Sequence, residues 1–138
     1  MDYLKNTLIY KIRGIRKKML MASKQALAES GLTLELYVAL HFAYENQGLT
    51  QKALADLVWT DSNVVVRMVD KLEEMALLRR VRHTDDRRAY SLYVTEKGEQ
   101  IANEYWQKLI EYQEECLASL SKQERQDFKR YLDVVLAE

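Results

Sequence analysis

The stretch that decides the fold of this chain runs from residue 49 to residue 95. It reads LTQKALADLVW (49–59), then DSNVVVRMVDKLEEMAL (61–77), then LRRVRHTDDRRAYSLYVT (78–95). The first two segments have the apolar spacing of short helices, and the third alternates apolar and polar residues after an arginine-rich turn. We therefore predict a helix-turn-helix followed by a β-hairpin, an arrangement that suits a DNA groove and its phosphates.

The composition bounds the class of protein. At 138 residues the chain is predicted to form a single domain over residues 1–138. It shows no secretory signal and no run of 18 apolar residues, so we expect a cytoplasmic protein with no membrane contact. The single cysteine, Cys116, cannot form an internal disulfide, which fits a reducing cytosol.

The formal net charge is zero, but the charges are segregated along the chain. Residues 1–24 carry seven Lys or Arg against one acid, and residues 79–88 carry five Arg against two Asp. Residues 96–138 carry ten acids against six bases. This distribution argues against a general polyanion binder and favours binding through one local surface.

Caps and apolar stripes predict the remaining elements. The apolar stripe Leu4, Leu8, Ile12, Ile15 and Met19 predicts a long first helix. This helix should end near Ser30-Gly31, where glycine can adopt the left-handed cap conformation. Further helices should begin after Thr33, Thr50, Thr60 or Asp61, Thr95, and Ser121, which forms a capping box with Glu124. The helix after Thr95 is expected to be long, with the stripe Ile101, Tyr105, Leu109, Tyr112 and Cys116. In the hairpin, Tyr90, Leu92 and Val94 should face inward opposite residues 79–83. The predicted fold is mainly α with a small β-wing: four helices, two strands, two helices.

The terminal helices carry apolar stripes outside the predicted winged helix-turn-helix, which occupies residues 33–98. A chain of this size has little with which to cover them. We therefore predict a homodimer built by residues 1–30 and 100–138, since a symmetric dimer is the commonest way to bury such faces. The alternative is that both helices fold back on their own domain.

Residues 49–98 resemble the MarR (multiple antibiotic resistance regulator) family of winged-helix transcription factors. The resemblance rests on LTQKALADLV, VVVRMVDKLEEMALLRR, DDRRAYSLYVT and the following EKG. It implies a winged helix-turn-helix with N- and C-terminal dimerisation helices and a DNA-binding function without enzymatic activity. Ala76 stands where the family usually has Gly, so a positive φ there would strain it. Val64 and Val66 stand where the family often has Thr, which changes the bases that the helix reads.

The start of the fourth helix holds the predicted base readers: Ser62, Asn63, Val64 and Arg67. Asn suits adenine, Arg suits guanine, and an aliphatic group suits the thymine methyl. Thr50 and Gln51 would offer a helix start to a phosphate. Two alternatives stay open: Arg67 pairs with Asp70, and Asn63 merely helps to cap the helix. Val66 fits either the core or the groove.

The wing supplies the second set of predicted contacts. By the resemblance, Arg88 enters the minor groove and Asp86 holds its guanidinium, with Arg87 beside it or facing away. An ordinary turn salt bridge is the alternative. The earlier arginines of the hairpin are expected to contact phosphates or other parts of the chain rather than bases: Arg79, Arg80 and Arg82.

No catalytic or metal-binding pattern competes with this interpretation. His41 and His83 lie in different predicted elements and far from Cys116 in sequence, and there is no glycine-rich phosphate loop, so we expect no metal and no cofactor. Cys116 is predicted to be a core thiol.

The resemblance also implies a pocket for a small aromatic or phenolic effector. The candidate residues are Tyr37, His41 and Tyr44 on one face of the second helix, with Met19 nearby. Aromatic residues at helical spacing suit a core equally well.

Two functions follow from these residues. The first is a homodimeric regulator, most simply a repressor, that binds a pseudo-palindromic operator in double-stranded DNA. The alternative is a winged-helix protein-interaction module without DNA binding. The wing arginines and the polar start of the fourth helix favour the first.

Overall fold

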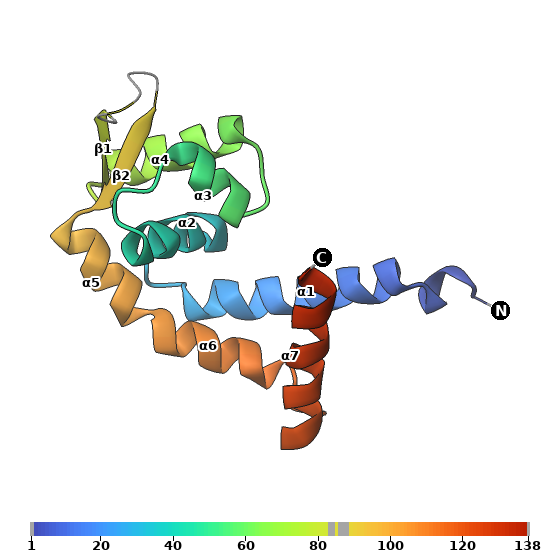
Figure 1. The fold of residues 1–138 in the computed structure, drawn as a ribbon. Coiled ribbons are helices and arrows are strands. Elements are labelled where there is room, and N and C mark those ends of the chain that lie inside the picture. The colour runs from blue at the N-terminus through green and yellow to red at the C-terminus, as the bar shows by residue number, and fades with distance from the viewer. Residues whose placement is uncertain (1, 83–84, 86–88, 138) are drawn as a thin grey trace.

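The computed structural model describes residues 2–82, 85 and 89–137. Within them the chain is mainly helical with a two-stranded wing, as predicted (Figure 1). In chain order the elements are η1 (Leu4–Asn6), α1 (Leu8–Ala26), α2 (Leu34–Glu45), α3 (Gln51–Leu57), α4 (Ser62–Glu74), β1 (Leu78–Arg82), β2 (Tyr90–Val94), α5 (Glu96–Glu104), α6 (Trp106–Glu115) and α7 (Lys122–Leu136). No helix in this part of the chain is long and apolar enough to span a membrane.

The predicted helix N-caps are confirmed. Thr33, Thr50, Asp61 and Thr95 each accept a hydrogen bond from a backbone N–H in the first turn of the helix that follows. Ser121 and Glu124 form the predicted capping box at the start of α7. The first helix differs from the prediction at both ends. Thr7 caps α1 and leaves Leu4 in the short η1 turn, and α1 ends at Ala26, with Leu27 as its C-cap, rather than near Gly31.

The winged part is built from α2, α3, α4 and the wing around one core (Figure 1). Leu40, Leu54, Val65, Leu72 and Leu92 are fully buried there. The strands pair antiparallel, from Leu78 opposite Val94 to Arg82 opposite Tyr90. The predicted inward face of β2 is wrong in one respect: Ser91 is also buried, because Thr50 pairs with it along the other edge of the strand.

The turn after α4 places Ala76 at φ 61°, in the left-handed region that favours glycine. The N–H of Ala76 donates to the Glu73 carbonyl and that of Leu77 to the Leu72 carbonyl, the hydrogen-bond pattern of a Schellman cap. Trp59 ends α3 in the same conformation, at φ 53°. The strain expected if Ala76 needed a positive φ therefore exists, and the turn keeps its geometry without glycine.

Gly98 lets α5 approach the start of the wing. A Cβ at this position would lie 2.1 Å from the Leu77 carbonyl oxygen and 2.7 Å from Val94 Cγ1. The same carbonyl accepts a hydrogen bond from the Thr95 N–H at 3.1 Å. The glycine of the EKG motif is thus required by close packing between backbones.

The long helix predicted after Thr95 is interrupted at Tyr105, which separates α5 from α6. The buried Tyr37 hydroxyl of α2 donates to the Ala102 carbonyl at 2.6 Å, and the described backbone hydrogen bonds include none from Trp106 to that carbonyl. A side chain that takes a carbonyl from the helical ladder is a recognised cause of helix kinks. The apolar stripe alone did not reveal this partner.

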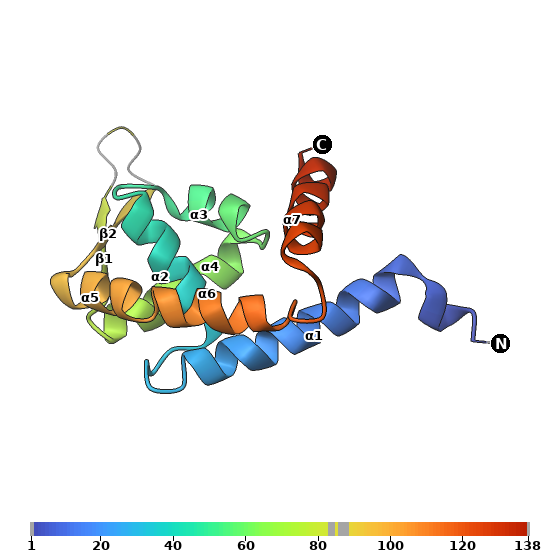
Figure 2. The same ribbon diagram turned by 90° about the horizontal axis from the view of Figure 1, so that it is seen from below.

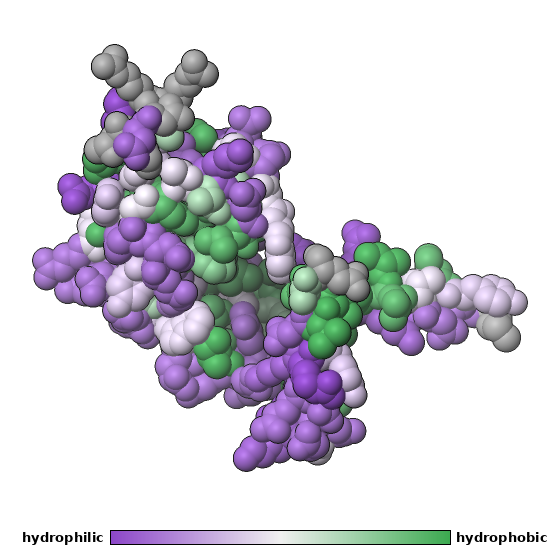
Figure 3. Space-filling model, in the orientation of Figure 1, coloured by the Kyte–Doolittle hydropathy of each residue, from purple (hydrophilic) through white to green (hydrophobic). Residues whose placement is uncertain are grey.

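The terminal helices extend beyond the winged part (Figures 1 and 2). α6 lies along α1, where Gln113 donates to the buried Ser23 hydroxyl at 3.2 Å, and α7 runs across the direction of α1. Figure 3 shows hydrophobic residues gathered on the projecting half of α1 and on α7. The large apolar residues left exposed there include Leu8, Ile9, Ile12, Ile15, Tyr131, Leu132, Val134, Val135 and Leu136. Within one chain these faces are not folded back onto the domain.

Candidate nucleic-acid interface

The N-terminal turns of α4 present the predicted base readers to solvent. Asp61 caps the helix by accepting from the Val64 N–H at 3.0 Å. Ser62, Asn63 and Arg67 are exposed and Val64 is half-buried, because the opposite face of the helix, with Val65, Val69 and Leu72, packs into the core. Val66, which fitted either environment, is exposed.

The structure does not support the two alternative roles considered for Arg67 and Asn63. Asp70, the proposed partner of Arg67, instead pairs with Arg80 at 2.6 Å. Among the described residues no ion pair or hydrogen bond involves the Arg67 side chain. Asn63 does not cap α4, since Asp61 holds that position. The helix therefore presents an amide and a guanidinium side by side on its exposed start.

The start of α3 lies beside this surface. The Thr50 hydroxyl accepts from the Ala53 N–H at 3.1 Å. The Gln51 side chain is engaged inside the protein, because its amide oxygen accepts from Arg80 Nε at 2.7 Å. Any contact of Gln51 with a phosphate would thus use its backbone.

The hairpin arginines that the structure describes, Arg79, Arg80 and Arg82, have intramolecular contacts, one of the two roles expected of them. Arg79 lies over the Tyr93 ring, 5.7 Å from its centroid, and Arg82 lies 5.4 Å from that of Tyr90. Arg80 is the most enclosed and contacts both α3 and α4. The predicted minor-groove residues, Asp86, Arg87 and Arg88, lie outside the described residues, as does His83.

A hollow of about 380 Å³ separates α2 from α6 and is lined by two of the four predicted effector residues, Tyr37 and His41. The His41 ring stacks on Trp106 with 4.3 Å between centroids, and Tyr44 packs edge-on against His41. Met19 is not part of its lining. The sequence analysis missed Trp106, and no local signal could have found it, since its partner is 65 positions earlier.

Tyr37 has a structural role within this hollow. Burial raises the pKa of its hydroxyl to about 12, so it stays protonated and donates to Ala102. The His41 imidazole Nδ1 lies 2.6 Å from the Glu45 carboxylate, at the rim. The hollow therefore combines aromatic walls with one carboxylate.

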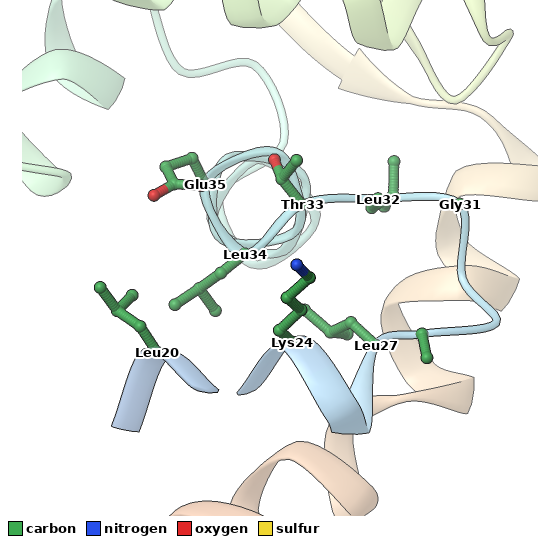
Figure 4. A pocket seen from close by; sticks show the side chains of 9 residues that line it. Leu20, Lys24, Leu27, Gly31, Leu32, Thr33, Leu34 and Glu35 are labelled. Atoms are coloured by element: carbon green, nitrogen blue, oxygen red, sulfur yellow. The ribbon is translucent and has the colours of Figure 1, made fainter. Parts of the chain in front are cut away.

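Two further hollows flank α2. One, of about 670 Å³, lies between α1, α2 and α4, with Arg16, Trp59, Val64 and Met68 among its lining residues. The other lies where α1 meets the start of α2 (Figure 4), with four leucines among its lining residues and the Lys24 ammonium directed toward the first turn of α2. None of the four predicted effector residues lines either hollow.

The prediction that Cys116 is a core thiol is wrong, because Cys116 lies where α6 ends and is only half-buried, outside the hydrophobic core. Its Sγ lies 3.6 Å from the Tyr112 carbonyl oxygen. Within the described part of the chain, no three His, Cys, Asp or Glu side chains gather as a metal ion would require.

Comparison with known proteins identifies the family. The MarR family profile matches residues 32–90. A putative transcriptional regulatory protein for the hcr operon of Thauera aromatica is 36% identical over 95 residues, which cover 69% of this chain and 57% of that protein. The organic hydroperoxide resistance transcriptional regulator of Bacillus subtilis is 27% identical over 127 residues, covering 92% of this chain and 83% of that one.

The same fold occurs in the crystal structure of an S. aureus MepR–DNA complex. It superimposes with a TM-score of 0.85 at 25% sequence identity, over 95% of this chain and 97% of that one. The segment matched by the family profile contains both helices of the helix-turn-helix and β1. This chain therefore belongs to the MarR family of DNA-binding, winged-helix transcriptional regulators, which are not enzymes.

Proposed function

We propose that this chain is a cytoplasmic homodimeric repressor that binds a pseudo-palindromic operator and leaves it when a small aromatic or phenolic molecule binds. The observation that carries the proposal is the exposed start of α4, where Ser62, Asn63 and Arg67 point away from the core. Helix-turn-helix proteins place this part of the second helix at base edges in the major groove.

The side chains suit specific bases. The Asn63 amide matches the donor and acceptor edge of adenine, and the Arg67 guanidinium matches guanine. The half-buried Val64 would leave a methyl group for thymine. Thr50 and the Gln51 backbone would lie near a phosphate, and Asp86, Arg87 and Arg88 would carry the minor-groove contact.

The dimer is supported by the apolar faces of α1 and α7. Leu8, Ile12, Tyr131 and Val135 are exposed, and burying such faces is worth roughly 25 cal/mol per Å². A two-fold dimer presents two recognition helices, so its operator would have half-sites about one helical turn (~34 Å) apart. Sedimentation at micromolar concentration should give about twice the 16.3 kDa chain mass. A folded monomer would count against the dimer.

The effector is supported by the hollow between α2 and α6. Its volume of about 380 Å³ lies in the range of small-molecule sites, and Tyr37, His41 and Trp106 give it aromatic walls. The Glu45 carboxylate would accept a hydrogen bond from a phenol. Tyr44 and Met19 would act from outside the lining, Tyr44 through its contact with His41.

The decisive test is a matrix of affinities at fixed salt. Duplexes selected by the wild-type protein from a random pool would be altered one base pair at a time. Asn63→Ala and Arg67→Ala should each lose ~1–3 kcal/mol of discrimination at one or two positions per half-site. Arg88→Ala should weaken binding to all related duplexes, most at A·T-rich flanks. Lys71→Ala, a solvent-facing change nearer the C-terminal end of α4, is the control that should leave every preference unchanged.

The same experiment tests the alternative. If the wild-type protein is folded and dimeric but selects no duplex, the protein-interaction module becomes the better interpretation. If Arg67→Ala and Asn63→Ala retain the full wild-type preference, α4 is not the reading element.

A further inference from the structure

Arg80 lies between the wing and the recognition helix and is largely enclosed, with 15% of its side chain exposed. Its guanidinium has partners on two helices. Nε donates to Gln51 Oε1 at 2.7 Å, Nη1 donates to Glu73 Oε1 at 3.1 Å, and Nη2 donates to the Val66 carbonyl at 3.1 Å and pairs with Asp70 Oδ1 at 2.6 Å. One strand residue therefore joins β1 to the start of α3 and to three residues of α4.

Glu73 holds this strand twice. Its Oε1 accepts from the Arg80 side chain, and its Oε2 accepts from the Arg80 backbone N–H, also at 3.1 Å. The backbone of β1 is thus attached to α4 as well as the side chain. The planar guanidinium fork suits several acceptors in a fixed geometry, which an ammonium does not.

The wing needs such an attachment. An isolated two-stranded ribbon is at best marginally stable in water, so its direction depends on what it packs against. The helix and the wing are proposed to enter different grooves, and the separation of these grooves is a property of the DNA. A wing free to change its angle to α4 would have to be ordered at each binding event, at a cost in affinity.

We propose that Arg80 is a positioning residue that holds the wing at the angle to α4 that DNA binding requires, without contacting DNA itself. The inference rests on the proposed placement of α4 and the wing in DNA. It distinguishes Arg80 from Arg79, its neighbour on the same strand, which is exposed and lies over the Tyr93 ring.

The acidic partners of Arg80 allow a test in which a purely electrostatic effect and a positioning role predict opposite changes in DNA affinity. The Asp70 and Glu73 side chains are 59% and 42% exposed and belong to the helix that reads DNA. If their only effect were electrostatic, Glu73→Gln would remove a repelling charge and tighten binding. If Glu73 holds Arg80 and the β1 backbone, the same change loosens the wing and weakens binding.

The experiment measures dissociation constants for a duplex selected by the wild-type protein, at several salt concentrations. Arg80→Met and Glu73→Gln should each weaken binding by about tenfold through lost preorganisation, with an unchanged salt slope. The double variant should bind no more weakly than Arg80→Met alone, because both changes disrupt one network. Arg79→Met, which removes the same charge from the same strand, should change the affinity by less than about threefold.

A hydroxyl-radical footprint supplies a readout that general loss of stability would not produce. In Glu73→Gln, this protection of the minor-groove sugars by the wing should fall, while protection of guanine N7 in the major groove from methylation by dimethyl sulfate, which α4 would provide, should remain. Wild-type or tighter binding by Glu73→Gln would overturn the proposal. So would a salt slope reduced by about one in Arg80→Met, which would mark Arg80 as a phosphate contact. If Arg80→Met fails to fold, the Glu73→Gln result still decides. Failure of the wild-type protein to select any duplex would instead refute the proposed function.

Discussion

Replacing Ala76 with glycine should stabilise this protein. Ala76 follows α4 at φ 61°, where an L-residue with a Cβ is held in an unfavourable conformation. The left-handed conformation costs a residue with a side chain roughly 1–2 kcal/mol relative to glycine. Ala76 is exposed, and its recorded hydrogen bonds involve only its backbone, so glycine would lose no contact of consequence.

Part of this gain in stability is offset by the greater conformational entropy of glycine in the unfolded state. Glycine has more conformations to lose on folding, which offsets about 0.4–1 kcal/mol. The expected net effect is therefore a stabilisation of about 0.8 kcal/mol, the difference between the midpoints of these two ranges. For a chain of this length that corresponds to a rise in melting temperature of roughly 2–4 °C.

Urea denaturation followed by circular dichroism, at equal protein concentration because a dimer links stability to concentration, would measure the change. The matched control is Ala53→Gly, the same substitution at an exposed position inside α3. There glycine should destabilise by about 0.5–1 kcal/mol, because a helix interior favours alanine. If Ala76→Gly shifts the midpoint in the same direction as Ala53→Gly, the left-handed strain is not an energetic cost in this protein.

Three further changes test other parts of the structure. Gly98→Ala should destabilise the fold by ~2 kcal/mol or more in urea, since the new Cβ would meet the Leu77 carbonyl oxygen at 2.1 Å; a wild-type midpoint would contradict the close packing. Tyr37→Phe should cost ~1 kcal/mol at neutral pH by removing the donor to Ala102. Because burial raises the Tyr37 pKa from 10.0 to about 12, its contribution is complete below pH 10 and is lost as the pH rises toward 12. Between pH 10 and pH 12 the urea midpoint should fall less for Tyr37→Phe than for the wild type. Equal falls in the two proteins would exclude Tyr37 as the cause of the lost stability. Cys116→Ser should leave DNA affinity and its response to peroxide unchanged, because the thiol is half-buried in a helix end; a wild-type oxidant response that the variant lacks would show that Cys116 is a switch.

Local patterns in the sequence were sufficient for most of the element boundaries. Thr33, Thr50, Asp61, Thr95 and Ser121 cap the helices that follow them, because a cap depends only on a side chain and a backbone N–H three positions later. The hairpin pairing and the exposed start of α4 follow in the same way from spacings of two and about three and a half residues.

The helix break at Tyr105 could not be predicted from such patterns. An apolar stripe predicts which face of a helix is buried but not which group will meet it. The hydroxyl that takes the Ala102 carbonyl comes from Tyr37, 65 positions earlier. The burial of Ser91 beneath the Thr50 pairing arises in the same manner, from a segment on another part of the chain.

The sequence by itself determined most helix starts, the strand pairing of the wing and the family, since these depend on neighbouring residues and on short motifs. The tertiary structure alone decided the partners of Arg80, for which the sequence allowed either a phosphate or an intramolecular contact. Its acceptors lie 29 positions away at Gln51, 14 at Val66 and 7 at Glu73. A guanidinium binds whichever acceptors the packed helices bring within about 3 Å, and that distance exists only after the chain has folded.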